Sequence, residues 1–210
     1  AQWHQLSATV RSSILKLFWN DDLGFLSDCL HASPGQPAGE ALADDALRPN
    51  QLLAITLGAV VDKPICHRIL GACEELRVPG GLRRLGDRMV SQPIEIIAHN
   101  QVLWDASEPY QGSYSGDEDT RRKPAYHNGT AWTWPFPSFC EAWALIYGSA
   151  GEAAALAWLS SGVRLLEKGC LGHIPEILDG DAPHTPRGCD AQAWGASELL
   201  RVWLKLTAVN

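Results

Sequence analysis

The chain lacks several patterns that would each assign it to a class of protein. Its 210 residues contain no apolar run of about eighteen residues, the length that a membrane-spanning helix needs, and no basic-then-apolar start that signals secretion. Lys and Arg number 17 against 24 Asp and Glu, and the basic run 121–123 follows three acids at 117–119 that compensate it. Clustered positive charge for phosphate binding is therefore missing. We expect no nucleic acid or membrane as partner, and a cytoplasmic location.

Cysteine occurs six times, but without the spacing of a metal site. There is no C-x-x-C pair, and the thiols lie mostly in apolar, helix-like surroundings, at positions 29, 66, 73, 140, 170 and 189. This pattern predicts reduced core residues of a cytoplasmic protein. We expect no disulfide framework, no metal site and no cofactor.

Phe and Tyr are scarce, with four of each, whereas Trp occurs nine times. An indole ring offers a flat apolar face together with an N–H donor, which suits stacking on a sugar ring, although large helical cores also use Trp. The excess of Trp is thus compatible with a carbohydrate ligand without requiring one.

The segment from Gly172 to Trp194 gathers ionisable side chains in a stretch that cannot be one regular element, because it contains three prolines and three glycines. A loop that presents carboxylates directly before an apolar helical run is typical of a pocket rim. Glu is a poor turn residue and Glu176 directly follows a proline, so we expect a chemical role for it. Asp190 is instead predicted to be the N-cap of the following helix.

Hydrophobic periodicity predicts six helices of two kinds. Apolar residues lie on one face in 2–19, 64–76 and 152–168, and on nearly all faces in 52–61, 131–147 and 191–206. The alternation predicts an all-α fold in which outer helices surround inner ones. Each loop that contains one of the candidate residues Arg48, His127 and Glu176 precedes an inner helix. We therefore expect these three residues to meet at one face.

Residues 78–130 form the longest irregular region. It is rich in Tyr and Gly, which favours a binding loop. Within it, 93–104 is compatible with either a short strand or a turn of helix.

Five ordered motifs spread over nearly the whole chain resemble one known family. They are R-P-N-Q at 48–51, G-L-R-R-L at 81–85, Y-x-G-x-Y-x-G at 110–116, Y-H-N-G-T-A-W-T-W at 126–134 and I-P-E-I-L-D-G-D-A-P-H-T-P-R-G-C-D-A-Q-A-W at 174–194. Together they resemble the C-terminal amylo-alpha-1,6-glucosidase domain of glycogen debranching enzymes. The resemblance covers essentially the whole chain, although the family usually has Ser where this chain has Gly195.

The resemblance implies an (α/α)6 barrel and an inverting hydrolysis of alpha-1,6-linked glucose at the branch points of glycogen or a related alpha-glucan. By that analogy Glu176 is the general base that activates water. Such a barrel has twelve helices and the sequence predicts about six, so 1–210 is expected to be the C-terminal part of the catalytic domain. The start at Ala1 rather than Met agrees with processing or a fragment.

One expected catalytic residue has no counterpart in the sequence. The family's general acid is an Asp in a T-W-M-D type motif, whereas the single Met here, Met89, lies in D-R-M-V. An inverting enzyme needs an acid as well as a base. We therefore expect the isolated chain to be inactive and to need an N-terminal half on the same or another chain.

Further residues are expected to bind substrate. His127 can donate to sugar hydroxyls while Trp132 or Trp134 stacks on the ring beside Tyr126, or it is simply a residue at the start of a helix. Arg48 either holds hydroxyls with its guanidinium or forms a buried ion pair. Asp179 binds sugar or shapes the turn, and for Asp181 we favour the turn. The remaining substrate-binding candidates lie in the matching motifs: Asn50, Gln51, Gln192 and Trp194.

A second class of function stays open at this point. Without an acid, the chain can be a carbohydrate-binding or interaction remnant of such an enzyme that has no catalytic competence.

Overall fold

The computed structural model describes residues 2–208. Ala1, Val209 and Asn210, which belong to the predicted domain 1–210, lie outside the described residues. Residues 2–208 contain seven α-helices, namely α1 (Gln2–Phe18), α2 (Leu52–Thr56), α3 (Lys63–Glu74), α4 (Lys123–His127), α5 (Phe136–Tyr147), α6 (Ser149–Val163) and α7 (Ala193–Thr207). Short 3-10 helices cover Ala38–Glu40, Pro49–Gln51 and Arg164–Glu167, and a π-helix covers Glu118–Arg122.

Between these helices, the described residues form eleven strands of two or three residues each. They are β1 (Trp19–Asn20), β2 (Phe25–Leu26), β3 (Leu30–His31), β4 (Leu42–Ala43), β5 (Arg77–Val78), β6 (Gly81–Arg83), β7 (Ile97–Ala98), β8 (Gln101–Val102), β9 (Ala131–Trp132), β10 (Ile177–Leu178) and β11 (Pro186–Arg187). Five of them form one antiparallel sheet in the order β11-β10-β9-β6-β5, and β1-β2, β3-β4 and β7-β8 form separate pairs.

The prediction of an all-α half barrel is wrong, because the five-stranded antiparallel sheet makes the protein mixed α/β. Strands this short leave no alternating pattern that spans several residues, so hydrophobic periodicity does not detect them. The β7–β8 hairpin settles the open question about 93–104 in favour of strand.

The predicted boundaries and faces of the inner helices also need correction. α5 begins at Phe136 and not near 131, because Ala131 and Trp132 pair with β6 and β10. The buried helix predicted at 52–61 ends at Thr56, and Leu57 is 77% exposed. α7 is one-faced, with Leu200 and Leu204 exposed. Its N-cap is Gln192, so the prediction that Asp190 caps it is wrong.

α5 is the centre of the helical layer. It packs against α2, α3, α6 and α7, and most of its residues are buried, including Phe136, Phe139 and Cys140. Pro137 lies in its first turn, where a missing N–H is harmless, and Gly148 ends it with φ of 59°. Buried Glu141 accepts hydrogen bonds from Arg201 and Lys205 and so ties α5 to α7.

The three thiols at 66, 73 and 140 are buried, as predicted, but Cys29 and Cys189 are exposed, so the prediction of core cysteines is wrong for these two. Both lie outside the helices, and Cys189 belongs to the segment 172–194 that the prolines and glycines predict to be a loop. All six cysteines are free thiols. No helix within residues 2–208 combines the length and apolarity required to cross a membrane.

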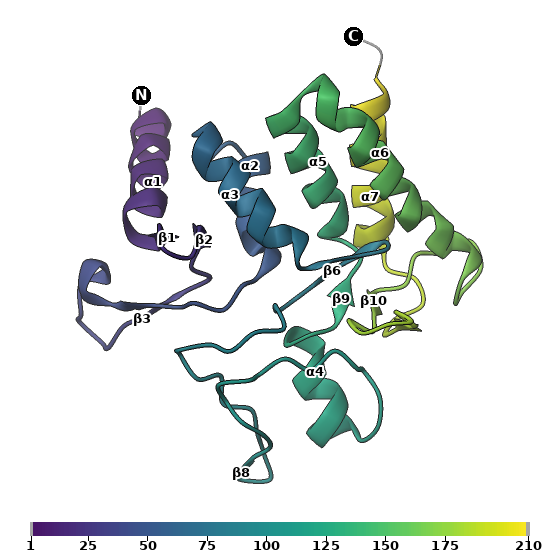
Figure 1. Ribbon diagram of the computed structural model, residues 1–210, viewed down its shortest axis with the longest axis horizontal. Coiled ribbons are helices and arrows are strands. Elements are labelled where there is room, and N and C mark those ends of the chain that lie inside the picture. Colours follow the sequence, from purple (N-terminus) through teal and green to yellow (C-terminus); the bar gives the residue numbers. More distant parts are fainter. Residues whose placement is uncertain (1, 209–210) are drawn as a thin grey trace.

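The helices lie on one side of the molecule and the long loops with α4 on the other, with β6, β9 and β10 between them (Figure 1). Trp132 of β9 pairs with Ile177 of β10 and with Leu82 of β6. The sheet thereby brings the 78–132 region and the 174–194 segment together at the loop side.

Candidate active site

Glu176 directly precedes β10 and is held by the backbone on both sides. Its N–H donates to the carbonyl of Cys189 at 2.9 Å, and its carbonyl accepts from the N–H of Thr133 at 3.3 Å. The residue is only 7% exposed. Its main chain therefore has little freedom to reorient the side chain.

Three donors converge on the Glu176 carboxylate. Oε1 accepts from the Tyr126 hydroxyl, in a short contact, and from Nε2 of Gln192 at 2.7 Å. Oε2 accepts from the N–H of Cys189 at 3.0 Å. An ionised carboxylate has acceptors only, so this set of partners suits the charged form and fixes its orientation.

A pocket of about 530 Å³ opens beside this carboxylate, within the range of small-ligand sites. Arg122, Arg187 and Tyr114 contribute to its walls, and Glu176 is the one carboxylate among the described residues that line it. Nε of Arg122 is buried and has no hydrogen-bond partner among the described residues. Gly188 has φ of 70°, and a Cβ there would lie 2.5 Å from Oε2, so glycine keeps the carboxylate's surroundings open.

Aromatic rings continue from Tyr126 to the surface. Tyr126 meets Trp132 edge to face with centroids 4.7 Å apart, Trp132 meets Trp194 at 5.7 Å, and Trp194 stacks on Trp134 at 5.5 Å. Trp132 is 4% exposed and Trp194 is 42% exposed. Burial, followed by the bond to Glu176, raises the pKa of Tyr126, so its hydroxyl remains a donor near neutral pH.

Asp179 and Asp181 hold the Tyr- and Gly-rich loop on the β10–β11 hairpin. Asp179 accepts from the N–H of Tyr114 at 2.8 Å and pairs with Nη2 of Arg187 at 3.0 Å, while Asp181 accepts from the Tyr110 hydroxyl at 2.8 Å. Nε of Arg83 donates to the carbonyl of Gly180 at 2.9 Å. Both oxygens of Asp179 are thus engaged by protein, and the two acids shape the wall of the pocket.

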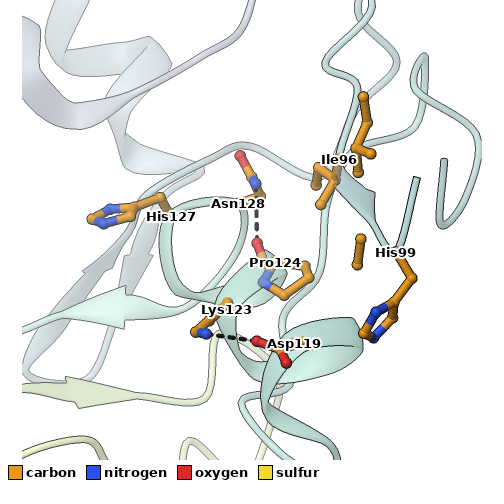
Figure 2. A pocket seen from close by; sticks show the side chains of 9 residues that line it. Ile96, His99, Asp119, Lys123, Pro124, His127 and Asn128 are labelled. Carbon is orange, nitrogen blue, oxygen red and sulfur yellow. Dashed lines mark hydrogen bonds and ion pairs between the residues drawn. The ribbon is translucent and has the colours of Figure 1, made fainter. Parts of the chain in front are cut away.

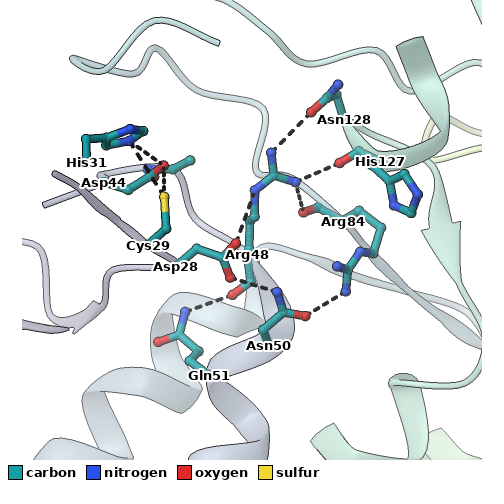
Figure 3. Close-up of polar contacts among 11 residues, drawn as sticks. Asp28, Cys29, His31, Asp44, Arg48, Asn50, Gln51, Arg84, His127 and Asn128 are labelled. Atoms are coloured by element: carbon teal, nitrogen blue, oxygen red, sulfur yellow. Dashed lines mark hydrogen bonds and ion pairs between the residues drawn. The ribbon is translucent and has the colours of Figure 1, made fainter. Parts of the chain in front are cut away.

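Arg48 lies in a network of internal contacts rather than at an open surface (Figure 3). Nη1 donates to the carbonyls of Arg84 at 3.1 Å and His127 at 2.7 Å, and Nη2 donates to Oδ1 of Asn128 at 3.1 Å. Nε lies 3.8 Å from Oδ2 of Asp28. The guanidinium therefore ties the start of α2 to the end of α4.

Asn50 and Gln51 extend the same network. Asn50 donates to Asp28 at 2.7 Å and accepts from Nη1 of Arg84 at 2.8 Å. Gln51 accepts from the N–H of Leu26 at 3.1 Å and donates to the carbonyl of Arg48 at 2.9 Å. These side chains join the N-terminal loops to the site.

His127 is exposed, and its ring stacks on Trp132 with centroids 5.4 Å apart. Partial burial, followed by the charges of Arg84 and Arg48, lowers its pKa, so the ring is neutral near pH 7. Since the His127 carbonyl binds Arg48 and the neighbouring Tyr126 binds Glu176, the prediction that Arg48, His127 and Glu176 meet at one face is confirmed.

A second pocket, of about 500 Å³, lies between α4 and the β7–β8 hairpin (Figure 2). Its carboxylate, Asp119, is paired with Nζ of Lys123 at 2.6 Å. Nearby, Asp117 caps the π-helix by accepting from the backbone and hydroxyl of Thr120, which lowers the pKa of Asp117. Neither acid is among the described residues that line the Glu176 pocket.

Sequence reasoning did not single out Arg122, Arg187 or the N–H of Cys189. Arg122 lies in the basic run 121–123, whose charge the acids at 117–119 compensate, so the sequence does not mark it as a site residue. The N–H of Cys189 is a backbone donor, which every residue except proline has. The motif Y-x-G-x-Y-x-G had pointed to the loop that contains Tyr114, but not to its role in the pocket wall.

The site thus combines a carboxylate fixed by three donors at a polar pocket with a line of aromatic rings. The comparison with protein families gives the particular assignment. The model of the family described as amylo-alpha-1,6-glucosidase matches residues 1–92 and 101–201. The chain belongs to this family, and it is therefore related to the glycosidases of glycogen debranching. A comparison with curated proteins gave no match.

Proposed function

We propose that the protein is a glycoside hydrolase that cleaves alpha-1,6-linked glucose at the branch points of glycogen-like glucans, with inversion at the anomeric carbon. The observation that supports this is the Glu176 carboxylate, which is held by Tyr126, Gln192 and the N–H of Cys189 at the wall of a pocket. Family membership supplies the substrate class.

In the proposed reaction Glu176 takes a proton from water while the water oxygen bonds to the anomeric carbon. The bond from that carbon to the glycosidic oxygen breaks, and the leaving oxygen takes a proton from a general acid. An inverting pair is separated by about 6.5–9.5 Å so that water fits between its members. Tyr126 and Gln192 keep Oε1 in place, so that the carboxylate does not turn away from this water.

The acid is proposed to lie on a segment other than those that line the Glu176 pocket, because Glu176 is the one carboxylate among the described lining residues. An N-terminal half, on the same or another chain, is the proposed source. On the binding side, the guanidinium of Arg122, which lines the pocket, would contact sugar hydroxyls, and Trp194 would stack against a sugar ring outside the pocket.

The test uses the protein expressed from its complete gene, assayed on a limit dextrin that carries single alpha-1,6-linked glucose stubs. We expect the glucose to be released as the beta anomer. NMR would identify the anomer that forms first. Glu176→Gln should lower turnover by about 10² to 10⁴-fold, because the amide cannot accept a proton, while binding of the dextrin is retained.

Asp179→Asn is the matched control, since it is the same acid-to-amide change at the other end of β10. It should retain most of the turnover. An active Glu176→Gln protein together with an inactive Asp179→Asn protein would transfer the role of base to Asp179. Release of the alpha anomer would reject inversion.

A non-catalytic carbohydrate-binding protein is the second candidate, favoured by the single carboxylate in the pocket and the exposed ring of Trp194. It predicts a change in Trp fluorescence on titration with branched dextrin, and no glucose release from the complete gene product. The assay for glucose release from branched dextrin therefore distinguishes the two candidate functions.

A further inference from the structure

The β3–β4 hairpin brings together three side chains of the types that ligate transition metals. In the antiparallel register Leu30 pairs with Ala43, and the N–H of Asp44 donates to the carbonyl of Cys29 at 3.0 Å. Cys29 and His31 are two residues apart and so project from the same face of β3, while Asp44 lies opposite Cys29. Strand pairing alone therefore places a thiol, an imidazole and a carboxylate on one side of the hairpin.

The three potential ligand atoms already have the separations of a tetrahedral site. Sγ of Cys29 lies 3.7 Å from Nε2 of His31 and 3.4 Å from Oδ2 of Asp44, and Nε2 lies 3.3 Å from Oδ2. Tetrahedral zinc with ordinary bond lengths gives edges of about 3.6, 3.5 and 3.3 Å for the same atom pairs. The separations of the three atoms therefore match those of a tetrahedral zinc site.

The carboxylate is oriented by a contact behind it. Oδ1 of Asp44 accepts from the N–H of Ala46 at 2.6 Å, which leaves Oδ2 facing Cys29 and His31 (Figure 3). Asp44 is buried whereas Cys29 and His31 are exposed. Second contacts of this kind hold metal ligands in position. The exposed side leaves the fourth coordination position to water.

We propose that Cys29, His31 and Asp44 form a zinc site with water as the fourth ligand, distinct from the Glu176 pocket. A thiolate and an imidazole favour zinc over magnesium or calcium, which prefer oxygen ligands. On binding, the Cys29 thiol gives its proton to solvent and the Sγ–Zn bond forms. The metal joins β3 to β4 and neutralises charge beside Asp28, which holds Arg48 and Asn50.

The test is titration of the complete, reduced and metal-stripped protein with Co²⁺ and then with Zn²⁺. We expect one Co²⁺ per chain, with a near-ultraviolet thiolate-to-cobalt band and the visible absorption of tetrahedral cobalt, both removed by Zn²⁺. Cys29→Ser should abolish the thiolate band and weaken zinc binding by at least about 100-fold, since even the loss of an outer contact costs about 10 to 100-fold.

Matched controls are Cys170→Ser for a thiol and His4→Gln for an exposed imidazole, and both should bind as the unaltered protein does. His31→Gln should weaken binding to a similar extent as Cys29→Ser. Zinc should raise the Tm of the unaltered protein and of the controls, but not of these two variants. No thiolate band in the unaltered protein, or a band that survives Cys29→Ser, would overturn the proposal, because the cluster would then be only a set of hydrogen bonds.

Discussion

Two clusters of polar side chains on the loop side of the molecule use similar residues in opposite ways. In the Glu176 cluster, which consists of Glu176, Tyr126, Gln192 and the N–H of Cys189, donors converge on a carboxylate that lines a pocket. In the Arg48 cluster, which consists of Arg48, Asp28, Asn50, Arg84 and Asn128, the donors end on internal carbonyl, amide and carboxylate oxygens.

The difference shows what distinguishes a reactive group from a structural one here. Both clusters are polar and part-buried, but the carboxylate on which the first converges lines a pocket, whereas the guanidinium at the centre of the second is bound by internal oxygens on all three nitrogens. The two meet at α4, where the His127 carbonyl belongs to one side and the Tyr126 hydroxyl to the other. The Arg48 cluster therefore positions α4, and through it the donor to Glu176.

The largest effect is expected from Arg48→Met, which keeps most of the apolar stem of the side chain but removes its donors. The carbonyls of Arg84 and His127 lose their partner, so we expect the free energy of unfolding to fall by about 3 kcal/mol. Urea unfolding measures it. Arg164→Met, at an exposed position, is the control and should change it by about 0.5 kcal/mol or less. Equal values for the two variants would remove the structural distinction between the clusters.

Tyr126→Phe should lower both turnover and the free energy of unfolding, because the bond from its hydroxyl to Glu176 exists in the folded protein. The ring and its contact with Trp132 remain, but Oε1 of Glu176 loses a charge-assisted hydrogen bond worth about 1.5–3 kcal/mol, which corresponds to about 10 to 100-fold in kcat. KM should change little. Tyr110→Phe, which removes the same kind of bond to Asp181, is the control. A similar loss of kcat in both variants would mean that Tyr126 only braces the loop.

A third cluster, in which Glu141 binds Arg201 and Lys205, is a second example of polar contacts with a structural role. Burial opposes ionisation of Glu141, but the bonds from Arg201 and Lys205 prevail and lower its pKa below the ordinary 4.5. The unfolded state then binds the proton more readily, so the stabilisation is complete above about pH 4.5 and is lost as pH falls through the lowered value.

Glu141→Gln should therefore cost about 1.5 kcal/mol at pH 7, reduced by the partial exposure of both cations, and progressively less below pH 4.5. Urea unfolding at several pH values measures this dependence. Glu198→Gln, which removes a pair within one helix, should cost only a few tenths of a kcal/mol. A Glu141 effect that does not change with pH would exclude the ion pairs as its cause.

The smallest effect is expected from Trp194→Ala, at the exposed end of the aromatic line. Loss of one stacking face should weaken binding of branched dextrin by about fivefold, or about 1 kcal/mol, with no change in stability beyond the loss of a contact with Trp134. Calorimetric titration measures it. Trp3→Ala on α1, where the ring is 79% exposed, should leave affinity unchanged.

The helices were predictable because their apolar residues repeat over several turns, and five of the six predicted segments contain a helix of comparable length, at α1, α3, α5, α6 and α7. The sheet was not predictable, because its strands consist of two or three residues that pair across long gaps in sequence. The predicted burial of α7 was too high, because the apolar residues of a helix do not show which of its faces packs against another element and which, like that of Leu200 and Leu204, is exposed.

The site was predictable in its location and less so in its contacts. The shared position of loops before inner helices brought Arg48, His127 and Glu176 together correctly. The sequence did not predict that Arg48 donates its hydrogen bonds to backbone carbonyl oxygens, because every residue has a carbonyl and the sequence does not show which ones lie near Arg48. For the same reason the N–H of Cys189 escaped notice. The substrate-binding roles of Asn50, Gln51, Trp132, Trp134, Asp179 and Gln192 stay predictions.

The bonds that build the site join distant parts of the chain. Tyr126 and Glu176 are 50 residues apart, Arg48 and His127 are 79 apart, and Arg83 and Gly180 are 97 apart. By contrast, α5 and α6 are consecutive and pack on each other with Gly148 as their only link. Closing long loops costs chain entropy before any contact repays it, so the helical hairpin can form early and the site must form late. A partly folded chain would thus keep much of its helical signal while having no assembled carboxylate cluster at all.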